Sequence, residues 1–202
     1  MSIQIYKPNS KNAGAAFTFA LSKGSNGAAP TLYISAISQF SWDEGKKIGT
    51  FGGNSKNPEK TVNVKINELE CGEIISAFRD RRDFTTFHSY EGSSTTIKLS
   101  PWDKPSKISK YDPSSKSFKD EKIIIPAFGI TISKGKGNSF KIAVEPGEIE
   151  VLSSLLSIFI NESLKFKINK HNSYSSKNSP KPAPPAVEDM DEDEDDMEDV
   201  PF

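Results

Sequence analysis

Six short segments of this chain alternate apolar and polar residues with a period of two, and β-branched or aromatic residues fill most of the apolar positions. Successive side chains of a β-strand point to opposite faces, so this alternation predicts strands with one buried and one exposed face. Half-exposed strands are typical of antiparallel sheets. The segments are Phe17–Phe19, Leu32–Ile34, Val62–Ile66, Thr95–Leu99, Ile130–Ile132 and Phe140–Val144.

Two other segments have the periodicity of helices. The first follows Asn67, which has Glu70 three residues later in the spacing of a capping box. The second begins at Pro146. Each helix follows several strands, so we expect an α+β fold with mostly antiparallel sheets rather than alternating strands and helices. The second helix has its apolar residues at helical spacing, namely Ile149, Leu152, Leu155, Leu156, Phe159 and Ile160.

The connections between these elements differ in character. Residues 133–138 contain two glycines between two expected strands, which predicts a hairpin loop. The lysine-rich segment 103–123 is interpreted as a mobile loop. Cys71 lies on the first expected helix and is predicted to be a small core residue. One cysteine and two histidines form no metal-ligand cluster, so neither a metal nor another cofactor is expected.

The formal net charge of −1 conceals a strong segregation of charge along the chain. Residues 188–199 contain ten acidic residues and no basic one. All 26 lysines and arginines therefore lie in residues 1–187 with the other 17 of the 27 acids, which gives this part +9 and the end −10. A basic body is attracted to polyanions by phosphate neutralisation, whereas the acidic end repels them. Nucleic acid is the predicted partner.

The domain organisation follows from this division. Residues 1–168 are expected to form one binding domain. Residues 169–187 are rich in Ser, Asn and Pro and predict a flexible linker, and residues 188–202 predict a disordered acidic tail. No run of about 18 apolar residues occurs, and the first residues lack the features of a secretory signal. We therefore expect a cytoplasmic protein without membrane contact, in the host cytoplasm if the protein is viral.

The last residues carry the most specific motif, because acidic residues lead directly to Val-Pro-Phe at the chain end. This end resembles the C-terminal tip of bacterial single-stranded-DNA-binding proteins. The resemblance implies a docking peptide for replication and repair proteins, in which the phenylalanine enters an apolar pocket and the acids meet a basic rim. The alternative is a solubilising tail that ends in phenylalanine. The docking residues would be Asp195, Asp196, Glu198, Asp199, Val200, Pro201 and Phe202.

The body also resembles a known family, the Whirly proteins, over residues 3–165. The resemblance implies two repeats of four strands plus a helix, single-stranded-DNA binding and a homo-oligomer. An OB-fold barrel is the alternative fold. The similarity is carried by Lys11–Phe17 after Tyr6 and Lys7, the aromatic, acidic and basic stretch Phe40–Lys47, the strand-into-helix segment Val62–Phe78, the pair Phe87 and His88, and the closing segment Ile142–Ile160.

Aromatic residues and lysines interleave in this body, as expected for single-strand binding, where rings stack on bases and cations follow the phosphates. The alternative is that several rings belong to the core and that the lysines of residues 133–138 lie in a solvated turn. The candidate DNA-binding residues are Lys7, Lys11, Phe40, Trp42, Lys46, Lys47, Phe51, Lys56, Lys60, Phe87, His88, Trp102, Lys134 and Lys136.

Signals for catalysis are poor. The glycine-containing segment at 134–138 lacks the spacing of a phosphate-binding loop, and no nucleophile and base are suitably paired. We therefore expect a non-enzymatic protein that coats single-stranded DNA in replication, recombination or repair. A bacterial-type tip on an unusual body suggests a phage or plasmid origin. The alternatives are a transcriptional regulator that binds single-stranded DNA, or an acidic-tailed histone-like protein or RNA chaperone.

Overall fold

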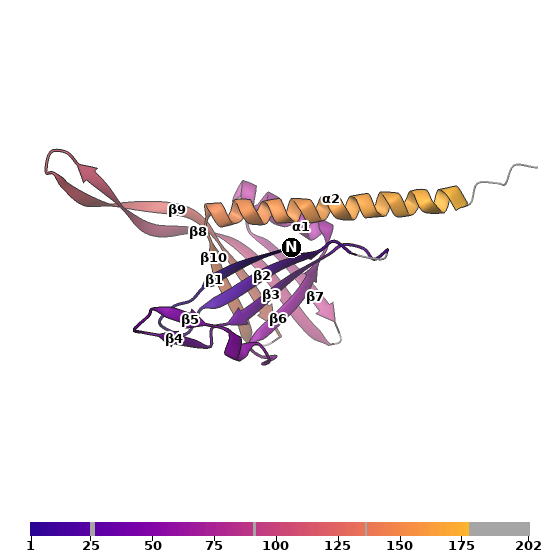
Figure 1. Cartoon of the computed structure of the whole chain (residues 1–202), viewed down its shortest axis with the longest axis horizontal. Coiled ribbons are helices and arrows are strands. Elements are labelled where there is room, and N and C mark those ends of the chain that lie inside the picture. Colours follow the sequence, from indigo (N-terminus) through magenta and orange to yellow (C-terminus); the bar gives the residue numbers. More distant parts are fainter. Residues whose placement is uncertain (25–26, 91, 136, 178–202) are drawn as a thin grey trace, which may run out of the picture.

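The structure is a computed structural model that describes residues 1–24, 27–90, 92–135 and 137–177. Two four-stranded antiparallel sheets are each followed by a helix (Figure 1). The first sheet has the strand order β1-β2-β3-β6, and the second has the order β10-β9-β8-β7. The elements are β1 (Ser2–Lys7), β2 (Ala15–Ser22), β3 (Thr31–Ser38), β6 (Thr61–Ile66), α1 (Glu68–Asp80), β7 (Phe84–Tyr90), β8 (Ser93–Asp112), β9 (Ser117–Lys134), β10 (Asn138–Val144) and α2 (Pro146–Lys177).

The expected architecture of two repeats of four strands plus a helix is confirmed. Each sheet is open, with β1 and β6 as the edges of the first and β10 and β7 as the edges of the second. The arrangement therefore differs from the closed OB-fold barrel that the sequence left as an alternative. Between β3 and β6 the chain adds a small lobe, which contains β4 (Ser41–Asp43), β5 (Ile48–Thr50) and the 3₁₀ turn η1 (Gly52–Asn54).

Helix α1 begins where the capping box predicts. The Asn67 side chain accepts a hydrogen bond from the Glu70 backbone N–H, and the Glu70 carboxylate accepts one from the Asn67 N–H. These two bonds satisfy donors that the first turn of a helix leaves without partners. The helix ends at Arg81, whose φ of +49° lies in the left-handed region.

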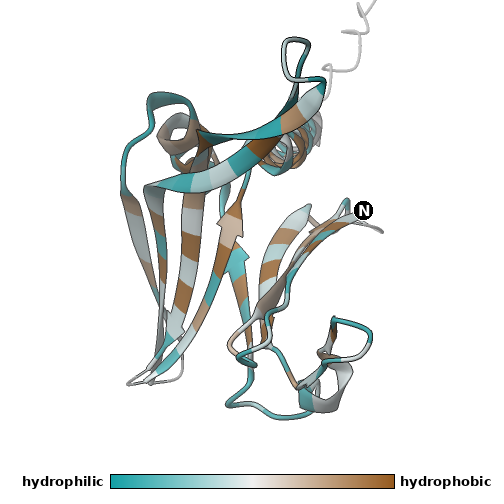
Figure 2. Ribbon diagram, turned by 90° about the vertical axis from the view of Figure 1, so that its left-hand side faces the viewer, coloured by the Kyte–Doolittle hydropathy of each residue, from teal (hydrophilic) through white to brown (hydrophobic). Residues whose placement is uncertain are grey.

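The core lies between the two sheets and the helices. Figure 2 shows hydrophobic residues recurring along the strands of both sheets, with both helices at one end. The Phe78 ring of α1 packs edge-on against the Phe128 ring of β9, with 5.1 Å between the ring centroids. Cys71 is fully buried, and this burial raises the pKa of its thiol to about 12. The largest fully buried side chains are Phe17, Phe128, Phe140, Leu32, Ile34, Ile66, Ile97, Leu99, Ile132, Leu152, Leu155 and Leu156.

Helix α2 extends to Lys177, which is further than the sequence indicated. It therefore includes residues 169–177 of the expected linker. No glycine or proline occurs between Glu148 and Ser179, and extending an existing helix costs much less than starting one. Figure 1 shows its C-terminal half projecting beyond the sheets. Within the described residues, no helix is both long and apolar enough to cross a membrane.

The segment 103–123 is not the loop that we expected. Strands β8 and β9 continue through it as a β-hairpin, paired from Asp103 with Pro126 to Asp112 with Ser117. We call residues 103–126 the arm. Its stabilising contacts cross from one strand to the other. The Tyr111 and Phe118 rings pack together with 5.5 Å between their centroids, and Lys110 forms an ion pair with Glu121. Both faces of the arm carry polar residues, so the single-faced apolar alternation that predicts strands is absent there.

Candidate nucleic-acid interface

The face of the first sheet that points away from the core is formed by small and uncharged residues with a few larger side chains. Paired residues of an antiparallel sheet lie on the same face. One row across the sheet contains Ala20, Tyr33 and Lys65. A neighbouring row contains Thr18, Ser35 and Asn63, and the Ser35 hydroxyl donates a hydrogen bond to the Asn63 side chain at 2.9 Å. The small side chains of β2 leave this face shallow and open.

A groove runs from the edge of this face to the second sheet. We call it the inter-sheet groove. It continues through Asn63 and Lys134 over the outer face of the first sheet to Thr18, Ile37 and Pro58. Strands from both repeats therefore contribute to one surface. Where the two sheets meet, its polar and aromatic lining consists of Tyr33, Asn63 and Lys65 from the first sheet and Phe87, His88, Ser89, Thr95 and Lys134 from the second.

Two aromatic rings and two lysines give the inter-sheet groove its chemistry. The Phe87 side chain is 76% exposed although it lies in a regular strand, and Tyr33 is 36% exposed. Lys65 is exposed, and the Lys134 ammonium donates a hydrogen bond to the Pro58 carbonyl at 3.3 Å. Exposed rings can stack on unpaired bases, and ammonium groups beside them can neutralise phosphates. The groove therefore combines the two kinds of group that a single strand requires.

His88 lies against helix α1. Its Nε2 atom lies 3.0 Å from Oε1 of Glu70, which also accepts a hydrogen bond from the Thr86 hydroxyl at 2.6 Å. The second oxygen of Glu70 is occupied by the helix cap. Protonation of His88 would make this contact an ion pair. His88 thus lines the groove with its ring directed toward α1 rather than presented flat as a stacking surface.

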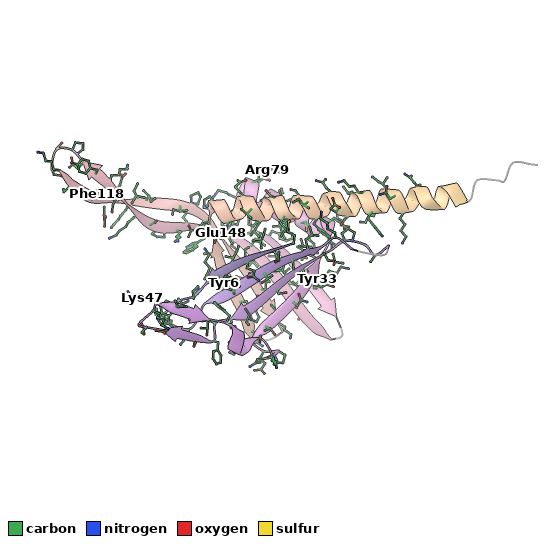
Figure 3. All side chains as sticks on the ribbon, in the orientation of Figure 1. Tyr6, Tyr33, Lys47, Arg79, Phe118 and Glu148 are labelled. Atoms are coloured by element: carbon green, nitrogen blue, oxygen red, sulfur yellow. The ribbon has the colours of Figure 1, made fainter. Side chains whose placement is uncertain are left out.

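The lobe at residues 40–57 carries the aromatic and basic stretch singled out in the sequence. Phe40, Lys46 and Lys47 are exposed on it, and Figure 3 shows Lys47 away from the two sheets. The Phe51 ring packs against the Tyr6 ring of β1, with 5.7 Å between the ring centroids, so it joins the lobe to the first sheet. Trp42 is half-buried, and its indole N–H is buried without a hydrogen-bond partner among the described residues.

Gln39 holds the lobe against the turn that precedes β2. It is 5% exposed, and its side-chain oxygen accepts a hydrogen bond from the Asn9 N–H at 2.9 Å. Its amide nitrogen donates to the carbonyls of Asn9 and Ser41, both at 3.0 Å, and to the Asn12 side chain at 3.2 Å. A Cβ on Gly14 would lie 2.4 Å from the Gln39 oxygen, so only glycine fits beside this amide.

Replacing Gln39 with alanine is expected to destabilise the protein by about 1–3 kcal/mol, because part-buried backbone groups of Asn9 and Ser41 lose their hydrogen-bond partner. Urea unfolding followed by circular dichroism measures this change. Gln4→Ala is the matched control, since Gln4 is exposed on β1 and its removal should change stability by less than about 0.5 kcal/mol. Equal stability of the two variants would contradict the bracing role of Gln39.

Comparison with known proteins supports the fold. No protein-family model matches the sequence, and no curated protein matches it. The solved structure of WHY1 from Arabidopsis thaliana superposes with a TM-score of 0.51 at 13% sequence identity, covering 87% of this chain and 92% of that chain. The chain has a Whirly-like fold.

The Whirly-like fold brings only some of the candidate residues together. Phe87, His88 and Lys134 line the inter-sheet groove. Lys56 and Lys60 are exposed on either side of Pro58, which contacts Lys134, so both lie near the groove's continuation.

Other candidates lie elsewhere on the Whirly-like fold. Lys7 forms a 2.6 Å ion pair with Glu148 at the start of α2, and Lys11 is exposed in the turn before β2. Trp102 is exposed on β8 next to the arm, paired with Ala127. Lys136 and the docking residues 195–202 lie outside the described residues.

Sequence reasoning missed Tyr33, Asn63 and Lys65. All three occupy the polar positions of strands that the alternation already predicted, so the signal was present. The alternation cannot show that β6 approaches β7 in the Whirly-like fold. This approach makes the three positions one side of a groove.

Proposed function

We propose that this protein binds single-stranded DNA through the inter-sheet groove without catalysing a reaction. The observation that carries the proposal is the combination of Tyr33 and Phe87 with Lys65 and Lys134 in one groove. Stacking on an aromatic ring contributes about 1–3 kcal/mol per base and is available to every base, because each base has a π-face. Bases inside a duplex are already stacked, so exposed rings favour an unpaired strand.

The charge distribution supports the same partner. Residues 1–187 carry +9, and a single strand that neutralises its phosphates on lysines releases counterions. The groove lining contains mainly Ser, Thr and Asn as hydrogen-bonding groups besides the rings and lysines. This composition favours binding with little sequence preference.

The wider role rests on the sequence. We propose that the protein coats single-stranded DNA during replication, recombination or repair as a homo-oligomer, and that the tip at Asp195–Phe202 recruits partner proteins. The Val-Pro-Phe end after ten acids supports recruitment. A phage or plasmid origin would explain why a bacterial-type tip ends a chain with this body.

A competition experiment tests the proposal. A fluorescent single-stranded oligonucleotide bound to the full chain is challenged with unlabelled single-stranded DNA, duplex DNA or RNA at two salt concentrations. We expect single-stranded DNA of any sequence to compete best, with affinities that fall as salt rises. Equal competition by duplex DNA, or competition by only one sequence, would contradict the proposal, and the latter would favour a transcriptional regulator.

The two lysines of the groove should determine part of the salt dependence. The double variant Lys65→Ala and Lys134→Ala is expected to reduce the slope of log affinity against log salt by about 1.4, because each lost phosphate contact removes roughly 0.7 on single strands. Titrations at several salt concentrations measure this slope. Lys23→Ala with Lys165→Ala removes the same charge from exposed positions outside the groove and should leave the slope near that of the parent.

A further inference from the structure

The arm is the largest feature that the inter-sheet groove does not use. Its ten residue pairs, from Asp103 with Pro126 to Asp112 with Ser117, extend about 30 Å at the rise of a β-strand. Figure 1 shows the arm projecting from the body at the opposite side from the end of α2. An isolated two-stranded ribbon is at best marginally stable in water. A ribbon of this length therefore suggests a surface that gains stability from a ligand.

The tip of the arm presents two aromatic rings to solvent. Tyr111 is 55% exposed and Phe118 is 72% exposed, and their rings meet edge-on at 5.5 Å. Figure 3 shows Phe118 at the far end of the hairpin. Each ring keeps a free face, because an edge-on pair leaves most of its π-surface uncovered.

The charges of the arm leave a positive surplus near these rings. The arm contains six lysines and four acids. Every one of the four carboxylates already has a cation, since Asp103 pairs with Arg81, Asp112 with Lys119, Asp120 with Lys107 and Glu121 with Lys110. Among the described residues, no carboxylate lies within ion-pair distance of Lys116 in the turn or Lys122 in β9.

We propose that the arm is a second binding surface for single-stranded DNA, used by the part of a strand that extends beyond the inter-sheet groove. Bases stack on Tyr111 and Phe118, and Lys116 and Lys122 contact phosphates. The inference rests on the proposed function. Rings interleaved with unpaired lysines are the chemistry of single-strand binding, whereas the centre of a protein interface is depleted of charged residues.

The test compares short and long oligonucleotides on the full chain. Lengths of about 8 and about 30 nucleotides are chosen around the 4–16 nucleotides that one small single-strand-binding fold covers. We expect the double variant Tyr111→Ala and Phe118→Ala to bind the long strand at least about thirtyfold more weakly, and the short strand as the parent does. Lys116→Ala with Lys122→Ala should act in the same direction without affecting the ring pair. Lys23→Ala with Lys165→Ala is the control of equal charge.

Each outcome has a defined meaning. Unchanged affinity for the long strand, or equal loss on both lengths, overturns the role of the arm while the groove function stands. Failure of the parent to bind either strand overturns the proposed function itself. Light scattering distinguishes DNA binding by the arm from a contact between copies of this chain. Arm variants that change the oligomer mass but not DNA binding would show that the arm is such a contact. In that case Ile124→Ser, which removes a 69% exposed apolar side chain, should change the mass as well.

Discussion

Removal of both rings from the inter-sheet groove is expected to weaken single-stranded-DNA binding by about 2–6 kcal/mol, or at least about thirtyfold. The double variant is Tyr33→Ala with Phe87→Ala. Each ring is exposed at the groove and contributes about 1–3 kcal/mol if a base stacks on it. Fluorescence titration with an oligonucleotide of about 10 nucleotides measures the loss.

Conservative variants make this result specific to stacking. Tyr33→Phe and Phe87→Tyr keep a ring at each position and should bind within a few-fold of the parent. Thermal unfolding checks that the alanine variant folds, which we expect because neither ring belongs to the core. A folded alanine variant with parental affinity would exclude the groove as the binding surface.

Loss of the terminal ring is expected to have a still larger effect on a different partner. Phe202→Ala should abolish binding to replication and repair proteins while DNA affinity stays near that of the parent. A docking peptide depends on its anchor in an apolar pocket, whereas all ten acids of the tail remain in this variant. Pull-down with the full chain and direct titration with DNA measure the two properties. The same partners captured by Phe202→Ala would refute the docking tip.

Truncation after Val187 separates competition from docking. The removed segment carries −10 and the remaining chain +9, so the tail is expected to compete with DNA as a tethered polyanion. The truncated chain should bind DNA more tightly at low salt, and the gain should shrink as salt rises because screening weakens both interactions. Unchanged affinity at low salt would show that the tail does not cover the basic surface.

The sequence was sufficient for elements that follow local rules. The alternation predicted strands of both sheets, and the Asn67 and Glu70 pair predicted the start of α1. The arm was missed because its contacts link residues on opposite strands and both faces are polar. The groove was only half predicted. Phe87 and Lys134 were among its candidates, but their meeting with Tyr33 and Lys65 depends on how the two sheets pack.

The rings of the lobe show a related limit. The stretch from Phe40 to Lys47 has the composition of a binding surface, yet composition cannot distinguish a ring that meets a ligand from one that meets a neighbouring strand. Phe51 packs on Tyr6, whereas Phe40 remains exposed. Only the packing of each ring in the folded structure separates the two roles.

Helix α2 acts as a spacer as well as a cover for the core. Its 32 residues correspond to about 48 Å, and only ten residues, 178–187, separate its end from the acidic block. The helix therefore carries Lys177 far from where the chain leaves the second sheet. If copies of this protein coat a strand side by side, as proposed, a helix that projects this far from its own body lies within reach of the next copy.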